Sequence, residues 1–267
     1  MRNIQVRNIT LDTGRPKIAI PVTGTTQEEI AQQCEAIMKL PCDIIEWRVD
    51  YYLASLSNLD ERIASNEVHL EIIRILDDID YITNGMPVIF TIRTKAQGGV
   101  VSLDSYKIHD LASLAAQSEL VAFVDVELFD ENDNLNQVQL AKRVEEIHEF
   151  DVKVIMSYHD FGRMPSLTEI NNIVKAMRTL GGDISKIAGM AKSKNDALLM
   201  LKAAKDLTEG DNDPVVMIAM GKEGMISRVA GGKFGSCITF AVGTETTAPG
   251  QVSATTLDRL LRECYAK

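Results

Sequence analysis

A single lysine is the one charged residue in the segment Ile184–Ala188, which is predicted to form a buried strand. A buried ammonium group is costly unless it is ion-paired or its pKa is lowered, so Lys186 is either a paired structural lysine or a nucleophile. Burial and nearby arginine cations would both lower the pKa of the amine. A neutral amine attacks a ketone to give an iminium ion, which acidifies the adjacent C–H bond. Lys186 is therefore the first candidate catalytic residue.

His159 stands in the run Met-Ser-Tyr-His-Asp-Phe at 156–161, just past the predicted strand 152–157. That strand precedes the one that carries Lys186, so in a sequential barrel the two side chains can converge. An imidazole there can take and return a proton near neutral pH. The alternative is a structural histidine held by hydrogen bonds. The remaining histidines, His69, His109 and His148, fall on predicted helices and are expected at the surface.

Other predicted strands also carry charged or polar residues where a parallel sheet is usually apolar. Side chains alternate along a strand, so residues two apart share a face. The polar sets that share a face are Glu46, Arg48 and Asp50, then Thr91 and Arg93, then Asp125 and Glu127. Such residues either line a site or form an inner network of ion pairs, in which some support others.

Short apolar runs alternate along the chain with amphipathic stretches, which predicts parallel strands joined by helices. Predicted strands are 18–22, 44–49, 87–92, 123–128, 152–157, 184–188, 215–220 and 236–241. The first helix is expected to open with a capping box at Thr25–Glu28, and later helices cover 60–78, 103–118 and 137–150. A second capping box at Ser166–Glu169 starts a helix that stops at Gly181, and the last helices cover 196–207, 225–230 and 255–265.

Eight such units without a spare domain predict an α/β fold, a (β/α)8 TIM barrel in which residues 1–267 form one catalytic domain. The segment Asn3–Leu11 is predicted to be a short hairpin that closes the barrel bottom. An open doubly wound sheet is the alternative. It usually has a glycine-rich phosphate turn after its first strand, and Val22-Thr-Gly24 does not fit that pattern.

The composition narrows the class of protein. Lys plus Arg is 28 and Asp plus Glu is 38, and the net charge of −10 argues against a nucleic-acid or anionic-membrane partner. The four cysteines form no CxxC pair and no metal-ligand spacing, so we expect reduced, packed thiols. Cys237, near a glycine-rich turn, is a poor candidate nucleophile because no basic partner is suggested nearby. Residues 1–10 contain no apolar leader, and a cytoplasmic protein is expected.

Taken together, seven segments resemble the type I 3-dehydroquinate dehydratases, the lyases of the shikimate pathway and aromatic amino acid biosynthesis. They occur in the family's order and span nearly the whole chain. The matching segments are Glu46–Asp50, Phe90–Thr94 with Gly98-Gly99, Asp125–Phe129, Ser157–Phe161, Lys186–Ala188, Ile226–Arg228 with Gly231, and Ala248–Gln251.

The resemblance implies a Schiff-base mechanism without metal or cofactor, in a protein expected to be a homodimer. Lys186 would condense with the C3 ketone of 3-dehydroquinate, and His159 would move the C2 proton to the departing C1 hydroxyl. Arg228 would hold the substrate carboxylate as a bidentate donor. Further substrate contacts would come from Glu46, Arg48, Arg93, Thr247 and Gln251, with Gln97, Met220 and Asp125 in supporting positions.

This chain departs from the family pattern in places. Gln97 stands where many members have Glu, and it can hydrogen-bond but cannot supply a base or a counter-charge. Pro21 stands where Ser is frequent, so one substrate hydrogen bond is expected to be missing. Thr247 replaces a common Ser and keeps the hydroxyl, and Gly-Met-Ala-Lys follows Lys186-Ile-Ala in place of Val-Met-Pro-Gln.

Two other functions remain open on the sequence. A Schiff-base aldolase would also need the strand lysine, but its substrates usually carry a phosphate, for which Gly231-Gly232 is a weak hint. A non-catalytic binding barrel predicts a broken Lys–His pair, and both residues are present here.

Overall fold

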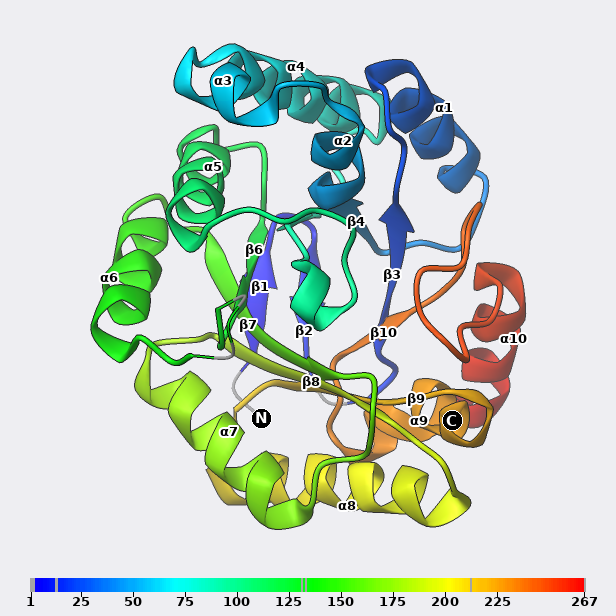
Figure 1. Cartoon of the computed structure of the whole chain (residues 1–267). Helices are drawn as coiled ribbons and strands as arrows, with labels where there is room; N and C mark the ends of the chain where they lie inside the picture. Colours follow the sequence, from blue (N-terminus) through cyan, green and yellow to red (C-terminus); the bar gives the residue numbers. More distant parts are fainter. Residues whose placement is uncertain (1–2, 13, 131, 133, 212, 267) are drawn as a thin grey trace.

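A repeated strand–helix unit builds the barrel, as the alternation of apolar runs predicts. The computed structural model describes residues 3–12, 14–130, 132, 134–211 and 213–266. Eight parallel strands form one sheet in the order β10-β3-β4-β5-β6-β7-β8-β9. An isolated parallel bridge between Val215 and Ser236 joins the two end strands. The helices form a ring outside the strands (Figure 1), so the (β/α)8 barrel is confirmed and the open sheet is wrong.

The strands of the barrel are β3 (Lys17–Val22), β4 (Ile44–Arg48), β5 (Val88–Thr91), β6 (Phe123–Glu127), β7 (Lys153–Asp160), β8 (Ile184–Met190), β9 (Val215–Met220) and β10 (Ile238–Phe240). The α-helices are α1 (Gln27–Ile37), α2 (Val49–Ser55), α3 (Leu59–Ala64), α4 (Glu67–Ile82), α5 (Ser105–Gln117), α6 (Gln137–His148), α7 (Leu167–Thr179), α8 (Lys194–Asp211), α9 (Ile226–Ala230) and α10 (Ala254–Tyr265). Short 3₁₀ turns are η1 (Lys95–Gln97), η2 (Lys222–Gly224) and η3 (Gly231–Phe234). No helix in these described ranges is both long and apolar enough to cross a membrane.

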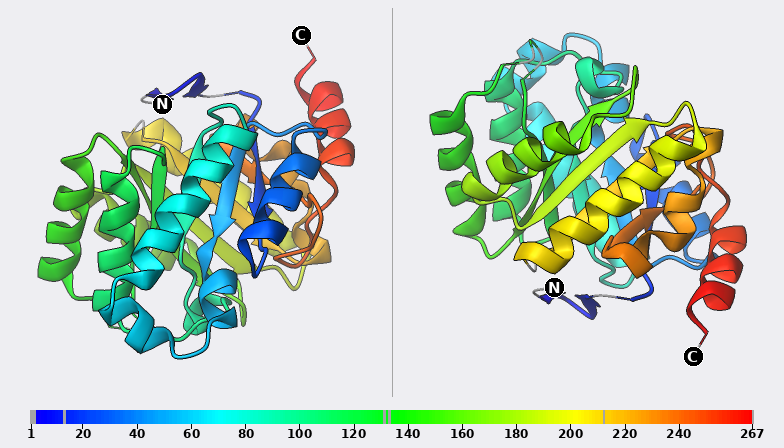
Figure 2. Two further views of the ribbon diagram at one scale, coloured as in Figure 1. Left: turned by 90° about the horizontal axis from the view of Figure 1, so that it is seen from above. Right: turned by 90° about the horizontal axis from the view of Figure 1, so that it is seen from below.

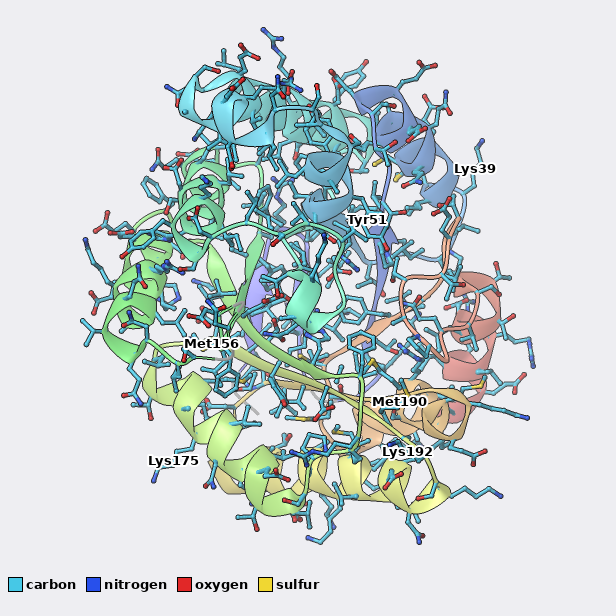
Figure 3. All side chains as sticks on the ribbon, in the orientation of Figure 1. Lys39, Tyr51, Met156, Lys175, Met190 and Lys192 are labelled. Carbon is cyan, nitrogen blue, oxygen red and sulfur yellow. The ribbon has the colours of Figure 1, made fainter. Side chains whose placement is uncertain are left out.

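Alternation along each strand divides the apolar residues into two cores. Outward residues such as Trp47, Phe90 and Met156 pack under the helices. Figure 3 shows Met156 within the fold, whereas Lys39 and Lys175 lie at its periphery. An inner cluster includes at least one residue from every barrel strand, and one layer of it consists of Ala19, Ile44, Ile89, Phe123, Ile155, Ile184, Val216 and Ile238.

The N-terminal hairpin closes one end of the barrel, as predicted. Its strands β1 (Ile4–Val6) and β2 (Ile9–Leu11) pair antiparallel. Ile4, Val6 and Leu11 are buried in the same inner cluster as the strand residues. Figure 2 shows the hairpin lying across an open end of the barrel. The amino ends of the strands are therefore covered by apolar side chains, and the carboxyl ends remain for a site.

Two capping predictions have different outcomes. The capping box at Ser166 and Glu169 is confirmed, with both reciprocal hydrogen bonds present. The box predicted at Thr25–Glu28 is wrong by one residue, because α1 begins at Gln27 and Thr26 is its N-cap. Glu29, rather than Glu28, occupies the third helical position, and its carboxylate accepts hydrogen bonds from the amide and hydroxyl of Thr25.

Three element boundaries differ from the sequence expectation. The helix expected over 60–78 is interrupted at Asn66, whose φ of 62° precedes the new helix α4. Asn58, with a φ of 52°, precedes α3 in the same way. Strand β4 ends at Arg48, so Asp50 lies in the first turn of α2 rather than on the strand. Strand β7 continues to Asp160, which places His159 on the strand and not beyond it.

The cap of α7 makes a direct prediction about stability. The Ser166 hydroxyl accepts from the Glu169 amide at 3.3 Å, so Ser166→Ala leaves that amide without its partner. We expect the free energy of unfolding to fall by about 1 kcal/mol, measured by urea denaturation. Ser65→Ala is the control, since its exposed hydroxyl donates only to the Arg62 carbonyl, and it should change stability by less than about 0.5 kcal/mol. Equal stability of both variants would contradict the prediction.

Candidate active site

The inward face of the barrel changes from apolar to polar as the strands run toward their carboxyl ends. Two residues beyond the inner apolar layer, the same alternation places Glu46, Thr91, Asp125, Ser157 and Lys186. A further two residues on, the next layer contains Arg48, Arg93, Glu127 and His159. The charged residues picked out from the sequence therefore gather at the carboxyl-end mouth, where TIM-barrel active sites form.

A pocket opens at this mouth and contains roughly 500 Å³ of space not filled by protein atoms. Every site residue expected from the sequence lines it except Asp125. The lining residues are Glu46, Arg48, Arg93, Gln97, Gly98, His159, Phe161, Lys186, Ala188, Ile218, Met220, Arg228, Phe240, Thr247, Ala248 and Gln251. Asp125 is buried behind this lining, where it supports other residues.

Lys186 lies on β8 with its side chain only 5% exposed. Its Nζ is 3.0 Å from Asp125 Oδ2 and 3.4 Å from Glu46 Oε1. The ammonium also lies 4.6 Å above the centre of the Phe240 ring, a cation–π contact. The unliganded chain thus holds Lys186 in ion pairs while keeping it at the wall of the pocket.

The arginines beside Lys186 have carboxylate partners of their own. Arg48 makes a bidentate pair with Asp50 at 2.7 and 2.8 Å. Arg93 pairs with Asp125 and with Glu127, each at 2.8 Å. Neither guanidinium is therefore an uncompensated cation. Burial lowers the pKa of both arginines, but these carboxylates more than offset it and raise the pKa.

Asp125 connects the charges of three strands. Its Oδ1 accepts from Arg93 at 2.8 Å and from the Ser157 hydroxyl at 2.6 Å, and its Oδ2 faces Lys186. Burial alone would raise the pKa of this carboxyl, but Arg93 and Lys186 hold it well below its usual range. Asp125 therefore remains an anion under ordinary conditions, and it fixes the two cations around it.

Asp50 has a supporting role that the sequence did not indicate. Besides Arg48, its carboxylate accepts from the backbone amides of Arg93 at 3.4 Å and Val100 at 3.3 Å. The fully buried Asp50 thus ties the end of β4 to the segment after β5. An acid two residues after a strand-end arginine was the available signal, but the assumption of a continuous strand assigned it to the wrong face.

His159 faces the same pocket from β7, the strand beside β8. Ser157 is the register partner of Lys186, and His159 is the partner of Ala188, so the two candidate residues come from adjacent strands. Burial lowers the pKa of His159 well below its ordinary value, and Arg93 and Lys186 lower it further. The imidazole is therefore neutral at pH 7 and has a free nitrogen that can accept a proton.

Gln97 contacts His159 directly. Its Oε1 accepts from the backbone amide of His159 at 2.9 Å and lies 3.3 Å from Nδ1. The amide Nε2 donates to the Phe129 carbonyl at 3.4 Å. Gln97 is 5% exposed, so it is a buried part of the pocket wall.

Arg228 differs from the other arginines of the pocket. It is only 2% exposed, and its guanidinium donates to the carbonyls of Gly250, Phe240 and Pro249. Within the described ranges it forms no ion pair with a carboxylate. Burial lowers its pKa to about 10, so it is still a cation at neutral pH. A buried, unpaired cation at a pocket wall is suited to an anionic ligand.

The loop after β10 is folded over the pocket by hydrogen bonds of its own. Gln251 Oε1 accepts from the amides of Thr247 at 2.9 Å and Ala248 at 3.2 Å. The Pro249 carbonyl accepts from the Gly221 amide at 3.1 Å as well as from Arg228. Thr247 and Gln251 are thus brought together, and Arg228 links this loop to the pocket.

Sequence reasoning missed most of the apolar part of the wall, apart from Met220. Phe161, Ala188, Ile218 and Phe240 line the pocket, but their types are also those of ordinary core residues. Phe161 packs on Gly98, where an added Cβ would lie 2.3 Å from the ring and φ is +86°. Cys237 lies outside the pocket, and burial raises the pKa of its thiol to about 12, so it remains a protonated thiol at neutral pH.

Known proteins resemble this chain over nearly its full length. The family model described as type I 3-dehydroquinase matches residues 18–267. A 3-dehydroquinate dehydratase of Listeria welshimeri is 33% identical over 263 residues, 98% of this chain and 97% of the relative. One from Clostridium botulinum is 35% identical over 265 residues, with the same two coverages.

Solved structures agree with the sequence relatives. The type I 3-dehydroquinate dehydratase of Clostridium difficile, solved with covalently modified comenic acid, matches with a TM-score of 0.88 at 32% identity, covering 99% of this chain and 98% of that one. The 3-dehydroquinate dehydratase of Geobacillus kaustophilus also has a TM-score of 0.88, at 28% identity, with 100% and 98% covered. The chain therefore belongs to the type I 3-dehydroquinate dehydratase family of hydro-lyases.

Proposed function

We propose that this chain converts 3-dehydroquinate to 3-dehydroshikimate through a Schiff base on Lys186, with His159 carrying the proton. The observation that supports the mechanism is the meeting of three groups in one pocket. A buried amine, a neutral imidazole from the adjacent strand and the unpaired cation of Arg228 all line it. A nucleophile, a base and an anion site are what an elimination from a keto acid requires.

Arg228 would bind the substrate carboxylate and so set the orientation of the ring. Two of its nitrogens already donate to carbonyls of the loop after β10. The carboxylate would supply the negative charge that the described pocket does not give this guanidinium. Glu46, Arg48 and Arg93 lie across the pocket and would contact ring hydroxyls, and Thr247 and Gln251 would cover the substrate.

The amine of Lys186 must lose a proton before it attacks the C3 ketone. Asp125 is a poor proton acceptor because Arg93 and Lys186 hold the pKa of its carboxyl well below the usual range. Glu46 is the other carboxylate in reach, at 3.4 Å from Nζ, and it lines the pocket. We assign it the proton. The neutral amine then adds to C3, and loss of water gives the iminium ion.

The iminium withdraws electrons from the C2–H bond. Neutral His159 takes the C2 proton, and the electron pair forms the C1–C2 double bond as the C1 hydroxyl leaves. His159 returns the same proton to that hydroxyl, which departs as water. A second water then hydrolyses the imine, which regenerates Lys186 and the C3 ketone. The net change is the loss of one water from the substrate.

The two other functions find less support. Gly231 and Gly232 precede β10 and therefore lie toward its amino end, away from the mouth. A Cβ at Gly232 would lie 2.1 Å from the Gly14 carbonyl oxygen, so close packing explains this glycine without a phosphate. A non-catalytic barrel does not account for Lys186 and His159 lining the same pocket.

Schiff-base formation can be trapped chemically. Borohydride reduction during turnover with 3-dehydroquinate should attach the ligand covalently to Lys186, and peptide mass spectrometry locates the adduct. Lys186→Ala should form no adduct and lose turnover. Lys192→Ala is the control, because this exposed lysine follows the same strand, and it should behave as wild type. An adduct at another residue, or normal turnover of Lys186→Ala, would refute the role of Lys186.

The role of His159 predicts a separation of two steps. His159→Ala should still form the trapped adduct, but kcat should fall by roughly 10²–10⁴, the contribution of a positioned acid–base group. Wild-type activity should also persist at pH values below the ordinary titration range of histidine, since the pKa of His159 is lowered and only the neutral ring is a base. Stopped-flow measurement of imine and product as a function of pH checks both. Unchanged kcat in His159→Ala would remove His159 from the mechanism.

The role of Arg228 predicts a binding defect. Replacing it in Arg228→Met removes charged hydrogen bonds worth about 1.5–3 kcal/mol, so KM should rise roughly 10- to 100-fold. Arg163→Met provides the control, since that exposed arginine pairs with Glu169 on the surface, and its KM should not change. Steady-state kinetics gives both values. If Arg228→Met kept the wild-type KM, the carboxylate would have to bind elsewhere.

A further inference from the structure

Gln97 is held in one orientation by groups whose chemistry is fixed. The backbone amide of His159 can only donate, so the Gln97 atom that lies 2.9 Å away must be the oxygen. The Phe129 carbonyl can only accept, so the atom 3.4 Å from it must be the Gln97 nitrogen. The two contacts agree on the same arrangement of the amide. Gln97 therefore presents an acceptor, and not a donor, to the His159 ring.

This orientation determines the state of the imidazole. Gln97 Oε1 lies 3.3 Å from His159 Nδ1, and an amide oxygen can only accept, so Nδ1 must carry the hydrogen. In a neutral ring the other nitrogen, Nε2, then has the lone pair. A base with its lone pair on one defined nitrogen is required if the proton is taken from one defined carbon.

The charged groups that face His159 come from four neighbouring strands or strand ends. Arg93, Lys186 and Arg48 disfavour a proton on the ring, and Asp125 favours it. Gln97, on the turn that follows β5, adds no charge to this set. A carboxylate in its place would add a negative charge in contact with Nδ1 and would favour the imidazolium.

We infer that Gln97 is a positioning residue that fixes the Nδ1–H tautomer of His159 without adding a negative charge beside the ring. This inference rests on the proposed role of His159 as the base. Its consequence is that the enzyme with Gln97 remains active at a lower pH than it would with Glu at this position. Below the pKa of His159 the ring is protonated and cannot take the C2 proton, so a lower pKa moves this limit downward.

Three variants separate position from charge. Gln97→Glu keeps an acceptor and adds a charge, although its second oxygen meets the Phe129 carbonyl without a hydrogen to donate. Gln97→Met keeps the approximate size and removes the acceptor. Gln117→Glu adds the same charge at the exposed C-terminal end of α5, away from the mouth, and is the control for net charge.

Nitrogen-15 NMR of the free protein measures the tautomer and the titration without using activity. The His159 signals are identified by their loss in His159→Ala. We expect a protonated Nδ1 and an unprotonated Nε2 in wild type, and a titration midpoint about one pH unit higher in Gln97→Glu. Gln97→Met should show a mixture of tautomers. A wild-type ring protonated on Nε2, or an unmoved midpoint in Gln97→Glu, would overturn the inference.

Kinetics gives a second, independent measure. The acid limb of kcat/KM should move to higher pH in Gln97→Glu. Gln97→Met should lose about tenfold or more in kcat at every pH with little change in KM, a part of the acid–base contribution. If Gln97 had only a structural role, its replacement would lower stability but leave both the acid limb of kcat/KM and the His159 tautomer unchanged. That result would contradict the inference.

Failure of this inference differs from failure of the proposed function. If wild type gives no borohydride adduct on Lys186, the Schiff-base mechanism fails, but the NMR tautomer is still measured. If the adduct forms in wild type and in both Gln97 variants, while the His159 tautomer and titration do not respond to Gln97, the inference alone fails.

Discussion

Asp125 binds Lys186 and Arg93 at the same time, and the arrangement of the pocket depends on this shared carboxylate. Each cation in the barrel interior would be costly if it were buried alone. Asp125 compensates part of both charges, and the Ser157 hydroxyl donates a further hydrogen bond to its carboxylate. Glu127 and Asp50 complete the pairing of Arg93 and Arg48. A polar layer inside a parallel barrel is stable because nearly every charge in it has an opposite charge in contact.

The exception to this pairing is informative. Arg228 is as buried as the others, yet carbonyl oxygens are its hydrogen-bond partners in the described part of the chain. Carbonyl dipoles can hold a guanidinium in place, but they leave its net charge for a ligand. The pocket therefore combines a balanced set of charges around Lys186 with one unbalanced cation. In the proposed mechanism, this difference separates the groups around Lys186, which carry out the chemistry, from Arg228, which binds the substrate carboxylate.

The sequence predicted the parts of this architecture that depend on local periodicity. Apolar runs located the strands, and the Ser166 capping box located a helix start. Lys186 and His159 were recognisable because a charge in an apolar run and a polar residue at a strand end are unusual there. Helix boundaries were harder to predict, since Asn58 and Asn66 begin new helices through positive φ angles, which an asparagine in the sequence does not by itself reveal. The ion pairs of Arg93 were not predictable, because Asp125 and Glu127 lie far from it in sequence.

The hairpin that covers the amino ends of the strands also limits how ligand and water can enter and leave the pocket. Ile4, Val6 and Leu11 fill that end with hydrocarbon, so ligand, product and released water all have to share the mouth at the carboxyl ends. The loop after β10 lies over this same passage. In the proposed mechanism, the water that hydrolyses the imine must therefore enter through this mouth or be the water just released from the substrate. Because the hairpin closes the amino end, the pocket is reached from the carboxyl-end mouth, over which the loop after β10 lies.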